Sequence, residues 1–266
     1  MTNAGNHTWG IEFDPIALVE KISSDMVFQI AYQEKELQER DIPKYVNPKS
    51  IGIITGNGPG SGISLWQKIN SNICDILQER FLGDISYPEI RIVSLPAMGL
   101  SMELDKRYDI TRDTLLSAVE TLKNENVEIL ALACHTTSYF QKEIKEIFNT
   151  NSQTFIPMPE SVLRYLKREK IYDLAILGIS YVAELAEWSA YTPLKAFNIE
   201  KLDNKTMKKS HELSYNLKKG LDYHKNFLKL INLFKNNINS QNLLIASTEL
   251  SILLENSIDK NKRSKW

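Results

Sequence analysis

The stretch Ile129-Leu130-Ala131-Leu132-Ala133-Cys134-His135-Thr136-Thr137 decides the fold class of this 266-residue chain. A short, unbroken apolar run that ends at polar residues is typical of a strand buried on both faces of a sheet. We therefore expect a strand at Ile129–Ala133, with Cys134 at its carboxyl end. Such strands occur in α/β proteins, where helices cover both faces of a parallel sheet.

The same pattern recurs along most of the chain. Further short apolar runs lie at Ile51–Thr55, Ile90–Ser94, Thr154–Pro157, Leu174–Gly178 and Leu243–Ala246. Amphipathic stretches that favour helices lie between them, among them Ser64–Arg80, Ile110–Asn124 and Ser161–Lys170. Ligands of parallel sheets bind outside the carboxyl ends of the strands, so we expect the functional residues in the loops that follow these runs.

Composition narrows the class of protein. The hydrophobic content of 42% is sufficient for one large domain or two small ones. The net charge of −1 favours no nucleic acid, and two cysteines are too few for a disulfide framework. We expect no secretion signal, and no segment approaches the roughly 20 apolar residues that span a bilayer. We expect a cytoplasmic protein without nucleic-acid or membrane partners.

Residues 1–49 precede this repeating pattern and are expected to form a helical extension. Asp14-Pro15 is a helix start, because an aspartate caps the helix and proline suits its first position. Apolar residues then recur at helical spacing between Ile16 and Ile30. A helix with one apolar face must bury it, either on its own domain or on a second subunit. We expect a homodimer.

Two loops that follow strands carry residues of interest. Thr55-Gly56-Asn57-Gly58-Pro59-Gly60-Ser61-Gly62 exposes backbone N–H groups before a helix, which suits an anion, although a tight turn is the alternative. It fits neither the dinucleotide nor the Walker pattern. Cys134 stands between a strand and a helix, where we expect a positive potential and a reactive thiol. Cys74 falls inside a helix and is expected to be a core residue.

The third loop, Ala246-Ser247-Thr248-Glu249, is similar to the Cys134 loop. In both, an apolar strand and an alanine precede a small nucleophilic side chain, with threonine nearby. This similarity predicts two related loops that face one another, and coincidence of common residues is the alternative.

These three loops resemble those of the aspartate/glutamate racemase family. The family loop Gly-Gly-Met-Gly-Pro corresponds to residues 55–59, Ala-Cys-Asn-Thr to residues 133–136, and Gly-Cys-Thr-Glu-Leu to residues 246–250. The resemblance extends from about Ser50 to Ser257. It implies two pseudo-symmetric Rossmann-like α/β lobes with parallel sheets, and a site in the cleft between them. The first lobe would comprise residues 50–152 and 244–266, and the second residues 153–243.

The resemblance also implies a mechanism. A cofactor-independent enzyme of this family inverts an acidic amino acid, with one cysteine removing the α-proton and another returning a proton to the opposite face. Carried over to this sequence, Cys134 and Ser247 occupy the catalytic positions. Substrate contacts would come from Asn57, Gly58, His135, Thr136, Thr248 and Glu249, with Glu249 orienting the second loop.

This sequence departs from the family at three points. Ser247 replaces the second thiol, and a hydroxyl is a much weaker acid–base. His135 replaces an asparagine that contacts substrate, and its imidazole is expected either to carry protons near neutral pH or to cap the helix. In Gly178-Ile179-Ser180-Tyr181-Val182 two family threonines have become apolar, which predicts a substrate other than aspartate or glutamate.

Other polar residues are interpreted as surface. We expect a solvated helix face at Lys208, Lys209, Lys218 and Lys219, with binding of an acidic partner as the alternative. His211 and His224 lack the spacing of metal ligands, so we expect surface histidines and no metal.

Three functions fit the sequence. The first is amino-acid racemisation through Cys134, with Ser247, His135 or water supplying the second proton. The second is a single-cysteine carbanion enzyme of the decarboxylase type, which needs a thiol on one face alone. The third is a catalytically inactive member of the family that binds a ligand or a protein.

Overall fold

The computed structural model describes residues 48–56, 58–81, 83–220 and 223–263. The helix expected within residues 1–49 therefore lies outside the described residues. Of that range, the structure describes only residues 48 and 49. Asn57 and the side chain of His224 also lie outside the described part.

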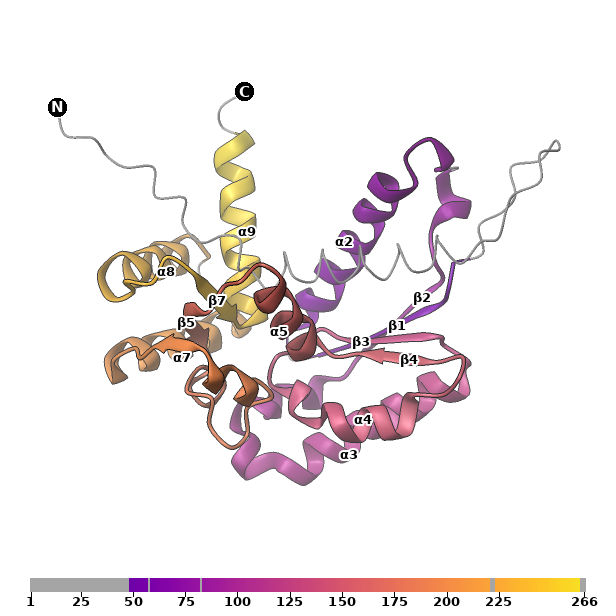
Figure 1. Cartoon of the computed structure of the whole chain (residues 1–266), viewed down its shortest axis with the longest axis horizontal. Coiled ribbons are helices and arrows are strands. Elements are labelled where there is room, and N and C mark those ends of the chain that lie inside the picture. The colour runs from indigo at the N-terminus through magenta and orange to yellow at the C-terminus, as the bar shows by residue number, and fades with distance from the viewer. Residues whose placement is uncertain (1–47, 57, 82, 221–222, 264–266) are drawn as a thin grey trace.

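Two parallel sheets form the framework (Figure 1). The first has the order β2-β1-β3-β4. Its strands are β1 (Ile51–Thr55), β2 (Ile90–Ser94), β3 (Ile129–Leu132) and β4 (Thr154–Ile156). The second has the order β6-β5-β7, with β5 (Asp173–Gly178), β6 (Asn198–Glu200) and β7 (Leu243–Ala246). Every pairing is parallel, so the predicted α/β fold with parallel sheets is confirmed.

Helices sandwich the first sheet, as its apolar strands require. On one face, Ile51 and Ile53 of β1 pack with apolar residues of α2 (Pro59–Leu77). On the other face, Ile54 packs with residues of α3 (Leu104–Asn124) and α4 (Gln141–Phe148). Alternate side chains of one strand therefore enter different cores, which is the period of two expected of a strand.

The second sheet has its own core. It buries residues of α5 (Met158–Arg168), α7 (Asn204–Lys218), α8 (Tyr223–Asn237) and α9 (Thr248–Arg263). Asp203 begins α7 by accepting a hydrogen bond from the backbone N–H of Thr206 at 2.9 Å. The short helix α6 (Ser180–Ala183) follows β5. Short 3₁₀ helices lie at Gln78–Arg80, Gly83–Ser86, Pro96–Glu103, Thr137–Phe140 and Thr192–Ala196.

The strand pairing places the lobe boundaries differently from the sequence-based expectation. β4 pairs with β3, so the first sheet continues beyond residue 152. β7 pairs with β5 and belongs to the second sheet. The following helix α9 contacts α2 of the first lobe as well as α7 and α8 of the second (Figure 1). The chain thus crosses between the lobes after β4 and again through α9.

The contact between β5 and β7 leaves no room for a side chain at Gly178. A Cβ atom there would lie 2.5 Å from the carbonyl oxygen of Ala246, its partner in the register. We expect Gly178→Ala to lower the free energy of unfolding by about 1–3 kcal/mol, measured by urea denaturation.

Gly99→Ala is the matched control, because a Cβ at that position meets nothing within 4 Å. The control should change stability by no more than about 0.5 kcal/mol. Equal stability of the two variants would contradict the tight packing of β5 on β7.

Candidate active site

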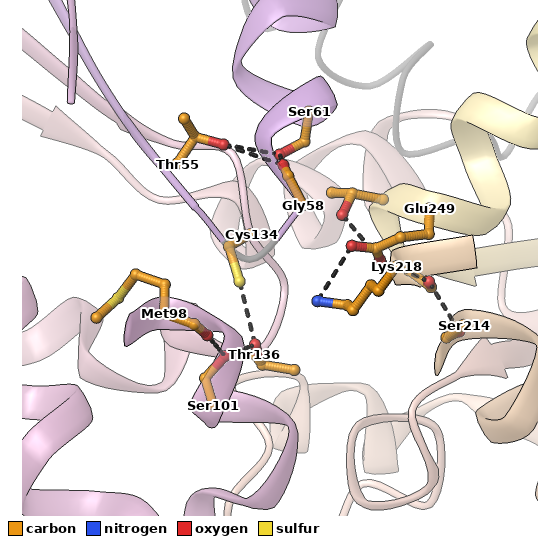
Figure 2. A network of polar contacts seen from close by, with 12 residues as sticks. Thr55, Gly58, Ser61, Met98, Ser101, Cys134, Thr136, Ser214, Lys218 and Glu249 are labelled. Carbon is orange, nitrogen blue, oxygen red and sulfur yellow. Dashed lines mark hydrogen bonds and ion pairs between the residues drawn. The ribbon is translucent and has the colours of Figure 1, made fainter. Parts of the chain in front are cut away.

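Three loops at carboxyl ends of strands make up the candidate site, one each after β1, β3 and β7. Figure 2 shows them together, with Gly58, Cys134 and Glu249 labelled. The first two loops are joined by Ser61. Its buried hydroxyl lies 2.8 Å from the carbonyl oxygen of Gly58 and 2.9 Å from that of Ala133, the residue before Cys134.

Cys134 begins the second loop and is buried, with 4% of its surface exposed. Its Sγ lies 3.1 Å from the hydroxyl of Thr136 and 3.5 Å from the backbone N–H of Thr137. The backbone N–H of Thr137 donates to the sulfur. The thiol and the start of the next helical turn are therefore together, as the sequence predicted.

A chain of hydroxyl groups extends from the thiol (Figure 2). Thr136 Oγ1 lies 2.6 Å from the hydroxyl of Ser101, which donates to the carbonyl oxygen of Met98 at 2.7 Å. The backbone carbonyl of Ser101 accepts from Tyr181 of the second lobe at 2.5 Å. Thr136, expected to hold a substrate carboxylate, is thus within hydrogen-bonding distance of the thiol itself.

His135 does not have the properties expected of a proton carrier. It is 3% exposed, and burial lowers the pKa of its imidazole to about 3. Its Nδ1 lies 2.7 Å from the hydroxyl of Tyr191, while its buried Nε2 has no hydrogen-bond partner within the described residues. The ring is therefore neutral near pH 7, and the expectation of proton transfer by imidazolium is wrong because the site excludes water from the ring.

The third loop is organised by one carboxylate. Glu249 Oε2 accepts from the hydroxyl of Ser247 at 3.3 Å and from that of Thr248 at 3.2 Å. Ser247 is 3% exposed, and its Oγ also lies 3.1 Å from the hydroxyl of Ser214 in α7. Glu249 therefore fixes both hydroxyls of this loop.

Glu249 also joins the lobes. A Cβ atom at Gly58 would lie 2.3 Å from Glu249 Oε1, and Gly58 has a positive φ of 101°. Both the backbone conformation and the closeness of the carboxylate therefore require glycine at this position. The glycine-rich loop and the Ser247 loop thus meet, whereas Asn57 is not among the described residues.

Lys218 is a site residue that the sequence interpretation missed. Its side chain is 16% exposed and its Nζ lies 3.2 Å from Glu249 Oε1 (Figure 2), so placing it on a solvated face was wrong. The contact is an ion pair without hydrogen-bond geometry, because neither atom has a hydrogen-bond partner in the described part of the chain. The signal was the spacing Ser210-Ser214-Lys218, which places three polar groups on one face of α7.

The second lobe contributes two more polar groups next to the site. The hydroxyl of Ser180 lies 3.2 Å from His211 Nδ1, and burial lowers the pKa of this imidazole. His211 is half-buried, which corrects its interpretation as a surface histidine. Ser180, His211 and neighbouring residues of α7 line a pocket of about 280 Å³.

The described ranges contain no group of three or more His, Cys, Asp or Glu side chains that could hold a metal ion. No helix in the same ranges is long and apolar enough to cross a membrane.

The fold is that of the aspartate/glutamate racemases. An aspartate racemase from Picrophilus torridus aligns with a TM-score of 0.57 over 77% of this chain and 83% of its own, at 16% identity. An aspartate racemase homologue from Pyrococcus horikoshii aligns with a TM-score of 0.53 over 77% of this chain and 88% of its own, at 19% identity. No protein-family model and no curated protein matches the sequence.

The burial of neutral His135 predicts a loss of stability in acid. Unfolding returns its pKa from about 3 to about 6.5, so the unfolded chain binds a proton that the folded chain excludes. Stability should fall as the pH drops below 6.5, by about 2 kcal/mol at pH 5, because each pKa unit corresponds to about 1.4 kcal/mol.

His135→Asn removes this contribution and provides the comparison. Urea denaturation at pH 7.5 and pH 5 should show a loss for the unsubstituted chain that exceeds the loss for His135→Asn by about 2 kcal/mol. Equal losses would mean that His135 is not buried in its neutral form.

Proposed function

We propose that this chain is a divergent member of the aspartate/glutamate racemase family and moves a proton at the α-carbon of an amino acid through Cys134. The observation that carries the proposal is the position of Cys134 on a racemase fold. It stands at the carboxyl end of β3, where the backbone N–H of Thr137 donates to its sulfur and the hydroxyl of Thr136 lies within hydrogen-bonding distance. As the family resemblance implies, the reaction needs no cofactor.

Removal of an α-proton requires stabilisation of the charge that develops on the substrate. Lys218 supports this step, because no group in the described ranges accepts a hydrogen bond from its buried ammonium group. A buried ion pair with unsatisfied donors is costly, and a substrate carboxylate would supply the missing acceptor. We infer that Lys218 binds a carboxylate of the substrate.

Ser247 supplies the proton on the opposite face in this proposal. Its hydroxyl is held by Glu249 and Ser214, so it is oriented even though it is a weaker acid than a thiol. Loss of a matched acid–base group costs on the order of 10²–10⁴ in rate, so slow inversion is expected.

The presence of Ser247 in place of a second thiol also favours a second candidate function. A carbanion formed by decarboxylation needs a proton on one face alone, and Cys134 could deliver it without a partner thiol. Carbon dioxide release from a carboxylated substrate, with no α-proton exchange of amino acids, would favour this function over racemisation.

Proton NMR in D₂O tests the proposal. With L- and D-forms of aspartate, glutamate and neutral amino acids, at least one substrate should lose its α-proton signal. Cys134→Ala should lower this exchange by about 10²–10⁴, because the base is removed.

Cys74→Ala is the matched control, since Cys74 lies within α2 and contacts the hydroxyl of Tyr87 at 3.3 Å. It should leave exchange unchanged within about twofold. Exchange that survives in Cys134→Ala would refute the assigned base, and absence of exchange from every substrate would refute amino-acid racemisation.

Lys218→Met tests carboxylate binding while keeping the length of the side chain. We expect the KM of the exchanging substrate to rise about 10- to 100-fold, the effect of losing a charged hydrogen bond of about 1.5–3 kcal/mol. Lys219→Met, at the exposed neighbouring position, should leave KM unchanged. Similar KM values for both variants would exclude Lys218 from the binding site.

A further inference from the structure

Tyr191 of the second lobe reaches the first catalytic loop. It precedes the 3₁₀ helix Thr192–Ala196 and is 1% exposed. Its hydroxyl lies 2.7 Å from His135 Nδ1, and the two rings are 5.7 Å apart between centroids. This contact joins two segments that are 56 residues apart in sequence and belong to different lobes.

The direction of this hydrogen bond follows from the protons that are available. Both side chains are neutral, because burial raises the pKa of Tyr191 and lowers that of His135. If Tyr191 donates to Nδ1, its own proton is satisfied and the ring hydrogen is on Nε2. The opposite direction would leave both the buried phenol proton and the Nε2 lone pair without a partner among the described residues.

The favoured direction has a chemical consequence. Nε2–H becomes a buried donor, and an unsatisfied buried donor costs about 1–3 kcal/mol. It belongs to the residue directly after Cys134. A neutral imidazole can polarise a substrate oxygen that gains charge during α-proton removal, without itself changing charge.

We propose that Tyr191 is a positioning residue that holds His135 as the Nε2–H tautomer, so that the Cys134 loop presents a neutral donor to a substrate carboxylate oxygen. The proposal rests on the function proposed above and assigns the partner of one substrate oxygen. An asparagine, which the family resemblance places at this position, has a permanent N–H donor. A histidine requires a neighbour to fix the nitrogen that carries the hydrogen.

Nitrogen-15 NMR of the full chain labelled at its histidine rings tests the tautomer without reference to activity. His135 is assigned by the signal that disappears in His135→Asn. Between pH 5 and 8 we expect an unprotonated, hydrogen-bonded Nδ1 and a protonated Nε2. In Tyr191→Phe both nitrogens should shift toward the values of two exchanging tautomers.

A protonated Nδ1 in the unsubstituted chain would overturn the proposal, even if Tyr191→Phe fails to fold. An unchanged tautomer in a folded Tyr191→Phe would overturn it as well. These results do not depend on turnover. Absence of α-proton exchange would count against the proposed racemisation, whereas the ring spectra decide the role of Tyr191.

A double-mutant cycle separates positioning from general structural damage. With the substrate that exchanges, Tyr191→Phe should lower kcat/KM about 10-fold in the unsubstituted background, the effect of one neutral hydrogen bond. In the His135→Asn background the same substitution should lower it less than about twofold. Equal losses in the two backgrounds would show that Tyr191 acts through folding, and would contradict the proposal.

Discussion

The carboxylate of Glu249 is the interaction on which the site depends. One oxygen accepts from both hydroxyls of the Ser247 loop, and the other lies against Lys218 and the backbone of Gly58. The residue lies in the first turn of α9, so its position is fixed by the end of β7 and by the packing of α9 on both lobes. A single side chain thus sets the distance between the glycine-rich loop of the first lobe and the hydroxyl loop of the second.

The two halves of the candidate site differ in their electrostatics. Around Cys134 the contacts are a hydroxyl and a backbone N–H, and the imidazole of the next residue, His135, is neutral. Around Ser247 the partners include a carboxylate and an ammonium group, both largely buried. A substrate that lay between them would meet neutral donors on one side and a fixed charge on the other. Such an arrangement favours a ligand with one carboxylate toward Lys218.

The fold could be predicted from the sequence where apolar runs were long enough. All six predicted strands exist, because their apolar side chains are buried in the cores on the two faces of the first sheet and in the core of the second. β6 was missed because Asn198–Glu200 is three residues long and has one apolar side chain. The predicted lobe boundaries differ from the observed pairing because the sequence does not show which strands become neighbours. Both β4 and β7 are short, mainly apolar runs, so their different sheets could not be told apart.

The loops of the candidate site could also be located from the sequence, since each follows a strand. The environment of their side chains was not, because it comes from segments far along the chain. The hydroxyl of Tyr191 determines the tautomer of His135, and Glu249 forms an ion pair with the largely buried Lys218. A lysine in a lysine-rich helix looks the same whether it faces water or a buried carboxylate. The spacing along α7 shows which side chains share a face of the helix, but it does not show which residues that face contacts.

The packing of α9 on α2 makes the site a late product of chain synthesis. Lys68 of α2 pairs with Glu255 of α9, a contact between residues 187 positions apart. A nascent chain that has completed the first sheet already holds the thiol, yet it lacks the carboxylate that closes the glycine-rich loop. Contacts of such long range form slowly, because a large loop must close before they contribute. The candidate site therefore takes its final form only after α9 has packed on α2.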